Sequence, residues 1–202
     1  MNPQKPHREF LLRLFTDTVV EVDFIDSPCY KELVKRIEGI RGKIPTDWLS
    51  LIDKSFDLAT SKLSKIRCSL CLAHRDFTPW NTYFAKGRLS VFDWEFAREA
   101  WPPMTDAFHF ITQKSILVDK MPPTKLFNLL LNEPSTSQGL FLSDLSRRIL
   151  AKPFSTHHLL LFYLTDISTT YFEHFIKHRS IDPNGRMLLS TWKHLMKFAL
   201  SC

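Results

Sequence analysis

The stretch that decides the fold runs from residue 74 to residue 95 and reads HRDFTPWNTYFAKGRLSVFDWE. It opens with the tripeptide H-R-D, residues 74–76, and four residues separate Asp76 from Asn81. Asp93 follows Asn81 by twelve residues and ends a mostly apolar run, residues 89–92. Phosphoryl transfer needs a carboxylate that orients or deprotonates the acceptor hydroxyl and oxygen ligands that hold Mg²⁺ on the nucleotide phosphates. This order and spacing of side chains therefore predict a phosphoryl-transfer site.

Each polar side chain of the stretch has an expected role. Asp76 is the candidate catalytic base, and Asn81 and Asp93 are candidate Mg²⁺ ligands, because that ion prefers hard oxygen donors. His74 is expected to hold the loop by hydrogen bonds, and Arg75 to balance the local negative charge. Asp and Asn are common in ordinary loops, where they bond the nearby backbone, so the prediction depends on their combination with a strand and a hairpin.

The composition is that of a globular protein. The 202 residues are 44% hydrophobic and 24% charged, which suits a single domain with a hydrophobic core. Glycine is scarce, with 5 residues, and phenylalanine is abundant, with 17. This balance favours helices packed on helices over a barrel of short strands, so we expect an α+β fold that is mostly α.

Charge and targeting signals narrow the class of protein further. The net charge of +6 comes from Lys and Arg spread along the chain, without a basic run interleaved with aromatics, so no nucleic-acid partner is expected. Charged residues interrupt the N-terminal 15 residues, which predicts no signal peptide. No stretch approaches the ~18 consecutive apolar residues of a membrane span. Together with four cysteines, these features predict a cytoplasmic protein with reduced thiols and no membrane partner.

The segments before residue 74 are expected to be mainly helical. Apolar residues at helical spacing and a Ser27-Pro28 start signal define the helices, and a β-branched run defines an extended segment. The expected elements are a helix over 7–16, an extended segment over 19–25, a helix from Ser27 to about Gly39, a helix after Pro45 that continues through Leu63, and a buried strand over 66–73 that leads into His74.

A hairpin and five helices are expected after the H-R-D loop. Residues 82–85 and 88–92 form the hairpin, with Gly87 in its turn, which would bring Asn81 and Asp93 to one end of a small ribbon. The five helices are expected to cover about 105–118, 123–131, 139–151, 155–178 and 183–199, with a polar loop over 133–138. Their start signals are Thr105 or Asp106 for the first, Pro122-Pro123 for the second, Ser155 for the fourth and Asp182-Pro183 for the fifth.

The segments HRDFTPWN, VFDWEFA and PPMTDAFHF resemble the catalytic core of the aminoglycoside phosphotransferase and choline kinase group. Those enzymes share the protein-kinase fold and carry an H-x-D-F-x-P-x-N loop followed by an I-D-W-E-like metal loop. The resemblance is strongest from Leu72 to Phe110. It implies ATP as phosphate donor, Mg²⁺ as cofactor and a small-molecule hydroxyl as acceptor. It also implies that Glu95 is a secondary Mg²⁺ ligand or a structural residue, and that Asp106 is a helix cap or a brace for the loop.

The resemblance implies the helical C-terminal lobe of a protein-kinase-like fold as one domain over residues 1–202, with its N-terminal β lobe largely absent. Only 73 residues precede His74, and they contain neither a G-x-G-x-x-G loop nor a V-A-I-K-like strand. A partner chain or a missing N-terminal lobe would then complete the nucleotide site. The expected function is an ATP- and Mg²⁺-dependent small-molecule phosphotransferase, and the alternative is a non-catalytic kinase-like binding module. The loop chemistry serves aminoglycosides, choline-like amines and sugars alike, so the resemblance implies the reaction class only.

Two groups of possible metal ligands are interpreted as structural. Cys68, Cys71 and His74 have the spacing C-x-x-C-x-x-H, but on an extended segment the two cysteines point to opposite faces, so buried thiols are expected. His174 and His178 share a helix face without a third ligand in the sequence pattern, so a solvated face is expected.

The aromatic residues near the loop are interpreted as core. Trp80 and Trp94 flank the two key loops, where core packing is favoured over the lining of a pocket. Residues 108–110 are expected to form a buried helix face. Side chains that meet a charged substrate are expected from the helices after residue 104.

Overall fold

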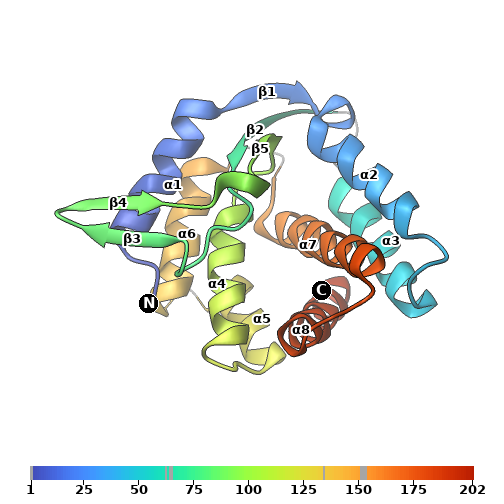
Figure 1. Ribbon diagram of the computed structural model, residues 1–202. Helices are drawn as coiled ribbons and strands as arrows, with labels where there is room; N and C mark the ends of the chain where they lie inside the picture. Colours follow the sequence, from blue (N-terminus) through green and yellow to red (C-terminus); the bar gives the residue numbers. More distant parts are fainter. Residues whose placement is uncertain (1, 62, 64–65, 134, 151–153) are drawn as a thin grey trace.

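The computed structural model of the chain describes residues 2–61, 63, 66–133, 135–150 and 154–202. Within them the protein is a mostly helical α+β structure with eight α-helices and two small antiparallel sheets (Figure 1). The helices are α1 (Lys5–Thr18), α2 (Pro28–Ile40), α3 (Thr46–Thr60), α4 (Thr105–Leu117), α5 (Pro123–Leu131), α6 (Ser137–Ile149), α7 (Thr156–His178) and α8 (Pro183–Leu200). The strands are β1 (Val20–Asp23), β2 (Arg67–Ala73), β3 (Thr82–Ala85), β4 (Arg88–Val91) and β5 (Arg98–Trp101), and short 3₁₀ helices cover Phe24–Asp26 and Trp94–Phe96.

Local sequence signals account for several helix starts. The side chain of Ser27 accepts a hydrogen bond from the Tyr30 N–H at the start of α2, and Ser155 caps α7 in the same way. Asp182 accepts from the Gly185 N–H at the start of α8. These three predicted N-caps are confirmed, because a side-chain oxygen there satisfies an amide that has no partner within the helix.

The larger sheet has β2 as its central strand, between β1 and β5. Val20 pairs with Leu70 on one side of β2, and Cys71 pairs with Trp101 on the other, where the register shifts before Ala73. The extended segment predicted over 19–25 is shorter than expected, because a 3₁₀ helix replaces its last residues. Strand β5 was not predicted, since four residues with only one buried side chain give no alternating pattern.

Two helix boundaries differ from the sequence prediction. Helix α3 ends at Thr60, so the expected continuation through Leu63 is wrong, and Leu63 lies in a turn. Helix α6 begins at Ser137, inside the segment that was expected to be loop, because Thr136 caps it by accepting from the Gly139 N–H. The predicted end of that helix, residue 151, lies outside the described residues.

The second sheet is the predicted hairpin. Thr82 pairs with Val91 and Ala85 with Arg88, and the two turn residues both have positive φ, +50° at Lys86 and +76° at Gly87. Two left-handed turn residues match the twist of the flanking strands, which explains the glycine in this turn. The hairpin extends away from the helices on the side of α1 (Figure 1).

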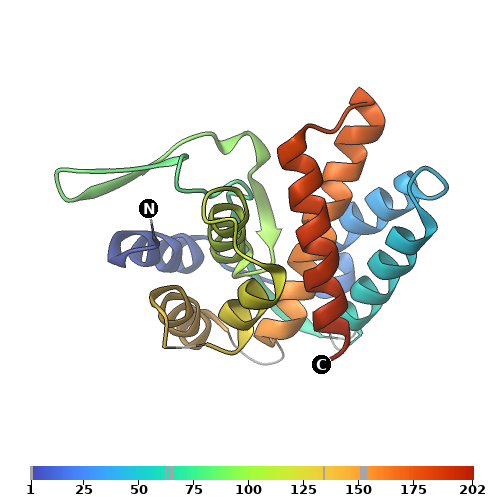
Figure 2. The same cartoon turned by 90° about the horizontal axis from the view of Figure 1, so that it is seen from below.

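Helix α7 is the central helix of the fold. It contacts α2, α3, α4 and α8, and Figure 2 shows α7 and α8 together in the middle of the molecule, with α2 and α3 on one side. Residues 159–169 of α7 are all buried, so this helix is apolar around most of its circumference rather than along one stripe. The polar residues inside this segment therefore need partners within the protein.

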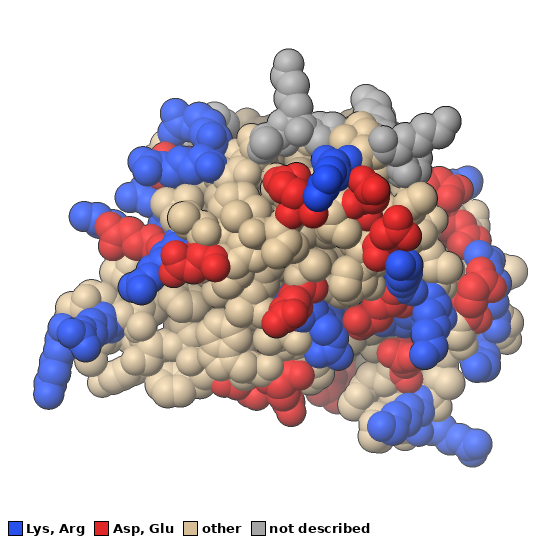
Figure 3. Space-filling view, turned by 90° about the horizontal axis from the view of Figure 1, so that it is seen from above, with Lys and Arg blue, Asp and Glu red and all other residues tan. Residues whose placement is uncertain are grey.

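The surface carries charges of both signs. On the face shown in Figure 3, Lys and Arg side chains are interspersed with Asp and Glu. The net charge of +6 is therefore not concentrated there in a block of one sign. Across the part of the chain that the structure describes, no helix combines the length and the apolar content needed to cross a bilayer.

The packing around α7 gives a stability prediction. Phe162 is 2% exposed and meets Phe24 edge to face at a ring-centroid distance of 6.1 Å. We expect Phe162→Ala to lower the free energy of unfolding by about 3–5 kcal/mol, because it leaves a cavity in a close-packed core. Urea denaturation of the wild type and the variant measures this difference in unfolding free energy. The control Leu140→Ala, at a position that is 59% exposed, should change the same quantity by less than about 0.5 kcal/mol. Equal effects of the two substitutions would contradict the prediction.

Candidate active site

Residues 74–81 form the loop between β2 and β3, and the start of α4 holds its backbone. The buried carboxylate of Asp106 accepts from the His74 N–H at 2.9 Å and from the Arg75 N–H at 2.7 Å. Burial raises the pKa of Asp106, and the two amide donors act against that rise. The expectation that Thr105 or Asp106 caps α4 is wrong, since the N-cap position is Met104. Asp106 instead braces the loop, the second role implied by the resemblance.

His74 connects the loop to the base of the hairpin. Its Nε2 lies 2.7 Å from the Phe92 carbonyl oxygen, and its Nδ1 accepts from the Asp76 N–H at 3.2 Å. Because a carbonyl only accepts, the proton of this imidazole is on Nε2. The Trp94 ring meets the imidazole edge to face, with a distance of 4.6 Å between the ring centroids. His74 is thus buried among fixed partners and holds the loop by hydrogen bonds, as the sequence analysis expected.

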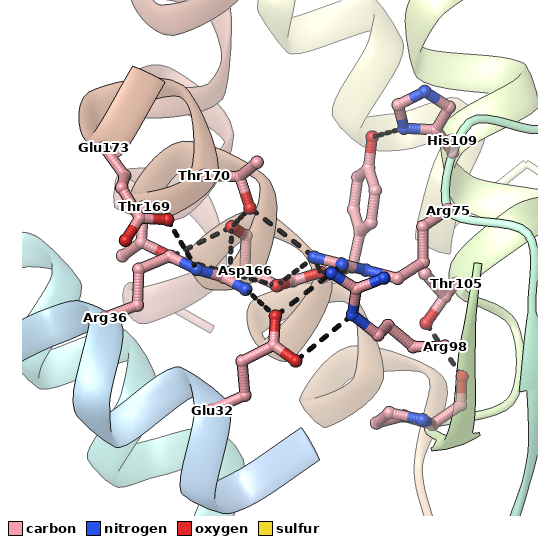
Figure 4. A network of polar contacts seen from close by, with 12 residues as sticks. Glu32, Arg36, Arg75, Arg98, Thr105, His109, Asp166, Thr169, Thr170 and Glu173 are labelled. Carbon is pink, nitrogen blue, oxygen red and sulfur yellow. Dashed lines mark hydrogen bonds and ion pairs between the residues drawn. The ribbon is translucent and has the colours of Figure 1, made fainter. Parts of the chain in front are cut away.

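Arg75 has a left-handed backbone, with φ of +66°, which is strained for a side chain of its size. Its guanidinium group donates to both oxygens of Asp166 on α7, at 2.8 and 3.0 Å (Figure 4). The same group lies over the Trp101 ring, 4.4 Å from its centroid. Arg75 was expected to balance local negative charge, and the carboxylate that it faces lies 91 residues further along the chain.

Asp166 also binds a second arginine. Arg36 of α2 donates to Asp166 Oδ1 at 2.6 Å, and both residues are buried. Burial alone would raise the pKa of Asp166, but the two guanidinium groups outweigh it and hold that pKa below its usual range. Sequence analysis missed Asp166, although a carboxylate in the middle of an otherwise apolar helical run is a signal that a buried cation lies nearby.

Further carboxylates complete this network (Figure 4). Glu32 pairs with Arg36 at 2.5 Å and with Arg98 at 3.4 Å, and Glu173 lies 3.7 Å from Arg36. Cations and anions thus alternate from α2 through α7 to β5, which lets several charges lie close together without net repulsion.

The carboxylate of Asp76 is held on two sides. Asn81 donates from Nδ2 to Asp76 Oδ2 at 2.8 Å and to the Asp76 carbonyl at 3.0 Å. His109 of α4, which is 3% exposed, places its Nε2 3.1 Å from Asp76 Oδ1. The Asp76 side chain keeps 30% of its surface exposed, so it is fixed in direction and still accessible.

The base of the hairpin brings the two predicted metal ligands to the same end of the ribbon. The Phe92 N–H donates to the Asn81 carbonyl at 2.9 Å, so Asn81 lies beside the residue that precedes Asp93. Asp93 has a left-handed backbone, with φ of +64°, a conformation that Asp tolerates. Among the described residues, the exposed carboxylates of Asp93 and Glu95 and the amide oxygen of Asn81 have no protein partner. These oxygens are the ligand type that Mg²⁺ takes, with water in its remaining positions.

Groups of three or more His, Cys, Asp and Glu that could hold a metal ion are absent from the part of the chain that is described. The buried cysteines of β2 behave as free thiols, and burial raises the pKa of Cys68 to about 11 and of Cys71 to about 12. The rings of His174 and His178 lie at a centroid distance of 4.2 Å and are tilted by 36°. Both residues are exposed on α7, as expected for a solvated face, and His174 also lines the rim of the cavity described next.

A cavity of about 570 Å³ opens beside Asp76. Its wall comes from the H-R-D loop, α4, α7, α8 and the 3₁₀ helix after Asp93, and it includes Arg75, Asp76, Phe96, His109, Tyr163, Tyr171, His174, Phe175, Asp182 and Asn184. This volume lies within the range of small-molecule sites, which are lined mainly by apolar and aromatic groups with a few polar ones. Helices after residue 104 thus supply most of the wall, as expected.

Aromatic side chains near the hairpin are more exposed than the sequence suggested. Trp80 is 51% exposed, so its interpretation as core is wrong, and Trp94 packs on His74 but is still 38% exposed. With Phe84, Phe92 and Phe96 they make up what we call the aromatic patch. All five belong to the hairpin and the turns that flank it, residues 80–96, and an exposed apolar patch usually marks a surface that binds a ligand or another protein.

Comparisons of this chain with protein-family models, with curated proteins and with solved structures find no significant match.

The buried network gives the second stability prediction. We expect Asp166→Asn to lower the free energy of unfolding at pH 7 by about 3–5 kcal/mol, because two buried guanidinium groups lose their counter-charge. Urea denaturation at constant ionic strength measures the effect. The matched control Asp53→Asn breaks an exposed pair with Arg41 and should change the same quantity by less than about 1 kcal/mol.

The effect of Asp166→Asn on the free energy of unfolding is expected to depend on pH. A carboxyl group whose pKa is lower in the folded state stabilises the fold above its unfolded pKa, and that contribution is lost as the pH falls through the folded pKa. The difference in unfolding free energy between the wild type and Asp166→Asn should therefore have its maximum value at pH 7 and decrease below about pH 4. A difference that stays constant down to pH 3 would show that Asp166 has no depressed pKa.

Proposed function

We propose that this chain is an ATP- and Mg²⁺-dependent phosphotransferase of the aminoglycoside phosphotransferase type, which transfers the γ-phosphate to a hydroxyl group of a small molecule. The observation that carries the proposal is the setting of Asp76. Its carboxylate is oriented by Asn81 and His109 and lines a cavity of about 570 Å³. A carboxylate fixed on two sides and open on a third is suited to orient a bound hydroxyl and take its proton.

A protein-kinase-like helical lobe is part of the same proposal. The order of the elements supports it: a buried strand leads into the H-R-D loop, a hairpin follows, then an exposed aspartate, and then a helix whose first turn braces the loop. The sequence segments between Leu72 and Phe110 that resemble the aminoglycoside phosphotransferase group follow one another in the same order.

The oxygens that suit Mg²⁺ lie on the hairpin side of Asp76. Asn81 donates its amide N–H groups to Asp76, which leaves its oxygen for an ion, and Asp93 and Glu95 offer exposed carboxylates. We assign Asn81 and Asp93 as the ligands, with Glu95 as a weaker one. A bound Mg²⁺ would neutralise charge on the nucleotide phosphates.

In the proposed reaction the acceptor hydroxyl binds in the cavity beside Asp76. Its oxygen forms a bond to the γ-phosphorus of ATP, the bond from that phosphorus to ADP breaks, and the hydroxyl proton passes to the Asp76 carboxylate. Little covalent work falls to the protein, so the rate depends on how firmly this carboxylate is positioned. The described residues before His74 form three α-helices, two strands and a 3₁₀ helix without a Gly-rich loop, so we assign the nucleotide's cover to a partner chain or to an N-terminal lobe.

The first test is calorimetric titration of the purified chain with Mg²⁺·ATP. We expect binding that requires Mg²⁺ and that Asp93→Ala weakens about tenfold or more, equivalent to at least ~1.4 kcal/mol, because a ligand of the ion is lost. The matched control Asp57→Ala, an exposed aspartate on α3, should bind as the wild type does. Equal binding by Asp93→Ala and the wild type would remove Asp93 from the metal site.

The second test addresses the base. Asp76→Asn should lower the rate of transfer to any accepted hydroxyl compound, or of ATP hydrolysis with water as acceptor, by about 10²- to 10⁴-fold, because the amide cannot take the proton. Thermal unfolding should be nearly unchanged, since the substitution keeps the shape of the side chain. Retention of the full rate in this variant would reject Asp76 as the base.

A non-catalytic kinase-like binding module is the second candidate function. The exposed aromatic patch favours it, because such a surface suits a partner protein, and so does the lack of a Gly-rich loop. A well-folded wild type that binds no Mg²⁺·ATP would favour this function over catalysis.

A further inference from the structure

Helix α4 carries a line of polar residues although nearly the whole helix is buried. Asp106, His109 and Gln113 stand at positions i, i+3 and i+7, which places them on one face. Asp106 binds the loop amides, His109 lies against the Asp76 carboxylate, and Gln113 shares a hydrogen bond with Tyr171 of the cavity wall. Burying a polar side chain costs free energy unless it forms hydrogen bonds. Each of these three residues has such a partner, and every partner belongs to the candidate site.

His109 is the member of this line that touches the reacting carboxylate. Its Nε2 lies 3.1 Å from Asp76 Oδ1, and its Nδ1 lies 3.3 Å from the Tyr163 hydroxyl. The Tyr163 hydroxyl in turn lies 2.7 Å from Thr112 Oγ1, one turn along α4. A chain of hydrogen bonds therefore runs from Thr112 through Tyr163 and His109 to Asp76, and all but Asp76 are buried.

The chemistry of these groups sets which imidazole nitrogen presents a proton to the carboxylate. An ionised carboxylate only accepts, so the imidazole must carry a proton on Nε2. Burial raises the pKa of Tyr163 far above its usual range, so the phenol keeps its proton. The Thr112 hydroxyl, 2.7 Å from the Tyr163 oxygen, donates its own proton to the Phe108 carbonyl at 2.8 Å. The imidazole is thus held between Asp76 and Tyr163, with its Nε2 proton directed at the carboxylate.

From this arrangement we propose that His109 is a positioning residue for the catalytic base, with Tyr163 holding the other side of its ring. The proposal rests on the proposed function and adds to it a residue that acts through Asp76. Asn81 holds Oδ2 from the hairpin side and His109 holds Oδ1 from the cavity side. The carboxylate is thereby prevented from turning, while each oxygen keeps a lone pair for the acceptor hydroxyl.

The test compares substitutions at one position in the full-length chain. His109→Gln keeps a neutral N–H donor near the place of Nε2, whereas His109→Leu fills a similar space without a donor. His194→Leu, at an exposed position on α8, is the matched control. The charged and titratable groups that face the His109 ring are Asp76 and Tyr163, with Asp106 on its own helix, and all three stay in place in every variant.

The kinetic measurement uses hydrolysis of Mg²⁺·ATP with water as acceptor. We expect His109→Leu to lower kcat by about 10- to 100-fold, the range expected for a lost hydrogen bond to a charged group, with KM for Mg²⁺·ATP unchanged. His109→Gln should recover most of the rate, and His194→Leu all of it. A wild-type kcat in His109→Leu, or equal losses in the Leu and Gln variants, would overturn the proposal.

The spectroscopic measurement is independent of activity. Imidazole ¹H–¹⁵N correlation spectra should show a proton on His109 Nε2 that is protected from exchange, and Tyr163→Phe should shift the resonance of Nδ1. A ring with no proton on Nε2, or one that averages both tautomers, would overturn the proposal. A wild type that hydrolyses no ATP would count against the proposed function, while these spectra would still decide whether His109 holds Asp76.

Discussion

The buried carboxylate of Asp166 is the interaction on which the candidate site depends. Two guanidinium groups converge on it, Arg36 from α2 and Arg75 from the H-R-D loop, and none of the three side chains is more than slightly exposed. Removing Asp166 would leave two guanidinium groups in the interior without their shared counter-charge, which is among the most costly changes a fold can undergo. The pair of bonds to Arg75 also holds a residue whose backbone is strained, with φ of +66°. Helix α7 thereby fixes the loop from one side.

Helix α4 fixes the same loop from the other side. Asp106 binds two consecutive loop amides, and His109 reaches the carboxylate of the next residue, Asp76. The loop has no regular structure of its own, so its shape comes from these two helices and from the hydrogen bond of His74 to the end of the hairpin. A catalytic group held by residues that are themselves locked in place can keep its geometry within tenths of an ångström, which preorganised catalysis requires.

Asp76 lies between two chemically different surfaces. On one side is the cavity, whose wall combines aromatic rings with a few polar groups, and on the other is the hairpin base, where amide and carboxylate oxygens face solvent. This division matches the two requirements of the proposed reaction, a neutral-to-polar pocket for an acceptor and hard oxygen ligands for an ion. The aromatic patch belongs to the hairpin and the turns that flank it, and one of its members, Phe96, also lines the cavity.

Local patterns in the sequence determined most of the secondary structure. Helical periodicity, the Ser27, Ser155 and Asp182 caps and the Lys86-Gly87 turn each depend on residues within a few positions of one another, so a single sequence contains the whole signal. The spacing of Asp76, Asn81 and Asp93 was visible for the same reason, since one short hairpin joins them. Their assigned roles remain predictions.

Only the tertiary structure decided which groups hold these residues in place. Asp166 lies 91 residues beyond Arg75, and His109 lies 33 residues beyond Asp76. Asp166 and His109 both belong to helices that are buried around most of their circumference, so no amphipathic stripe indicates which face meets the site. Strand β5 was missed because pairing with β2, rather than its own four residues, makes it a strand. Long-range partners such as these are selected by packing and by the cost of burying a charge or a donor alone, and a linear sequence records neither.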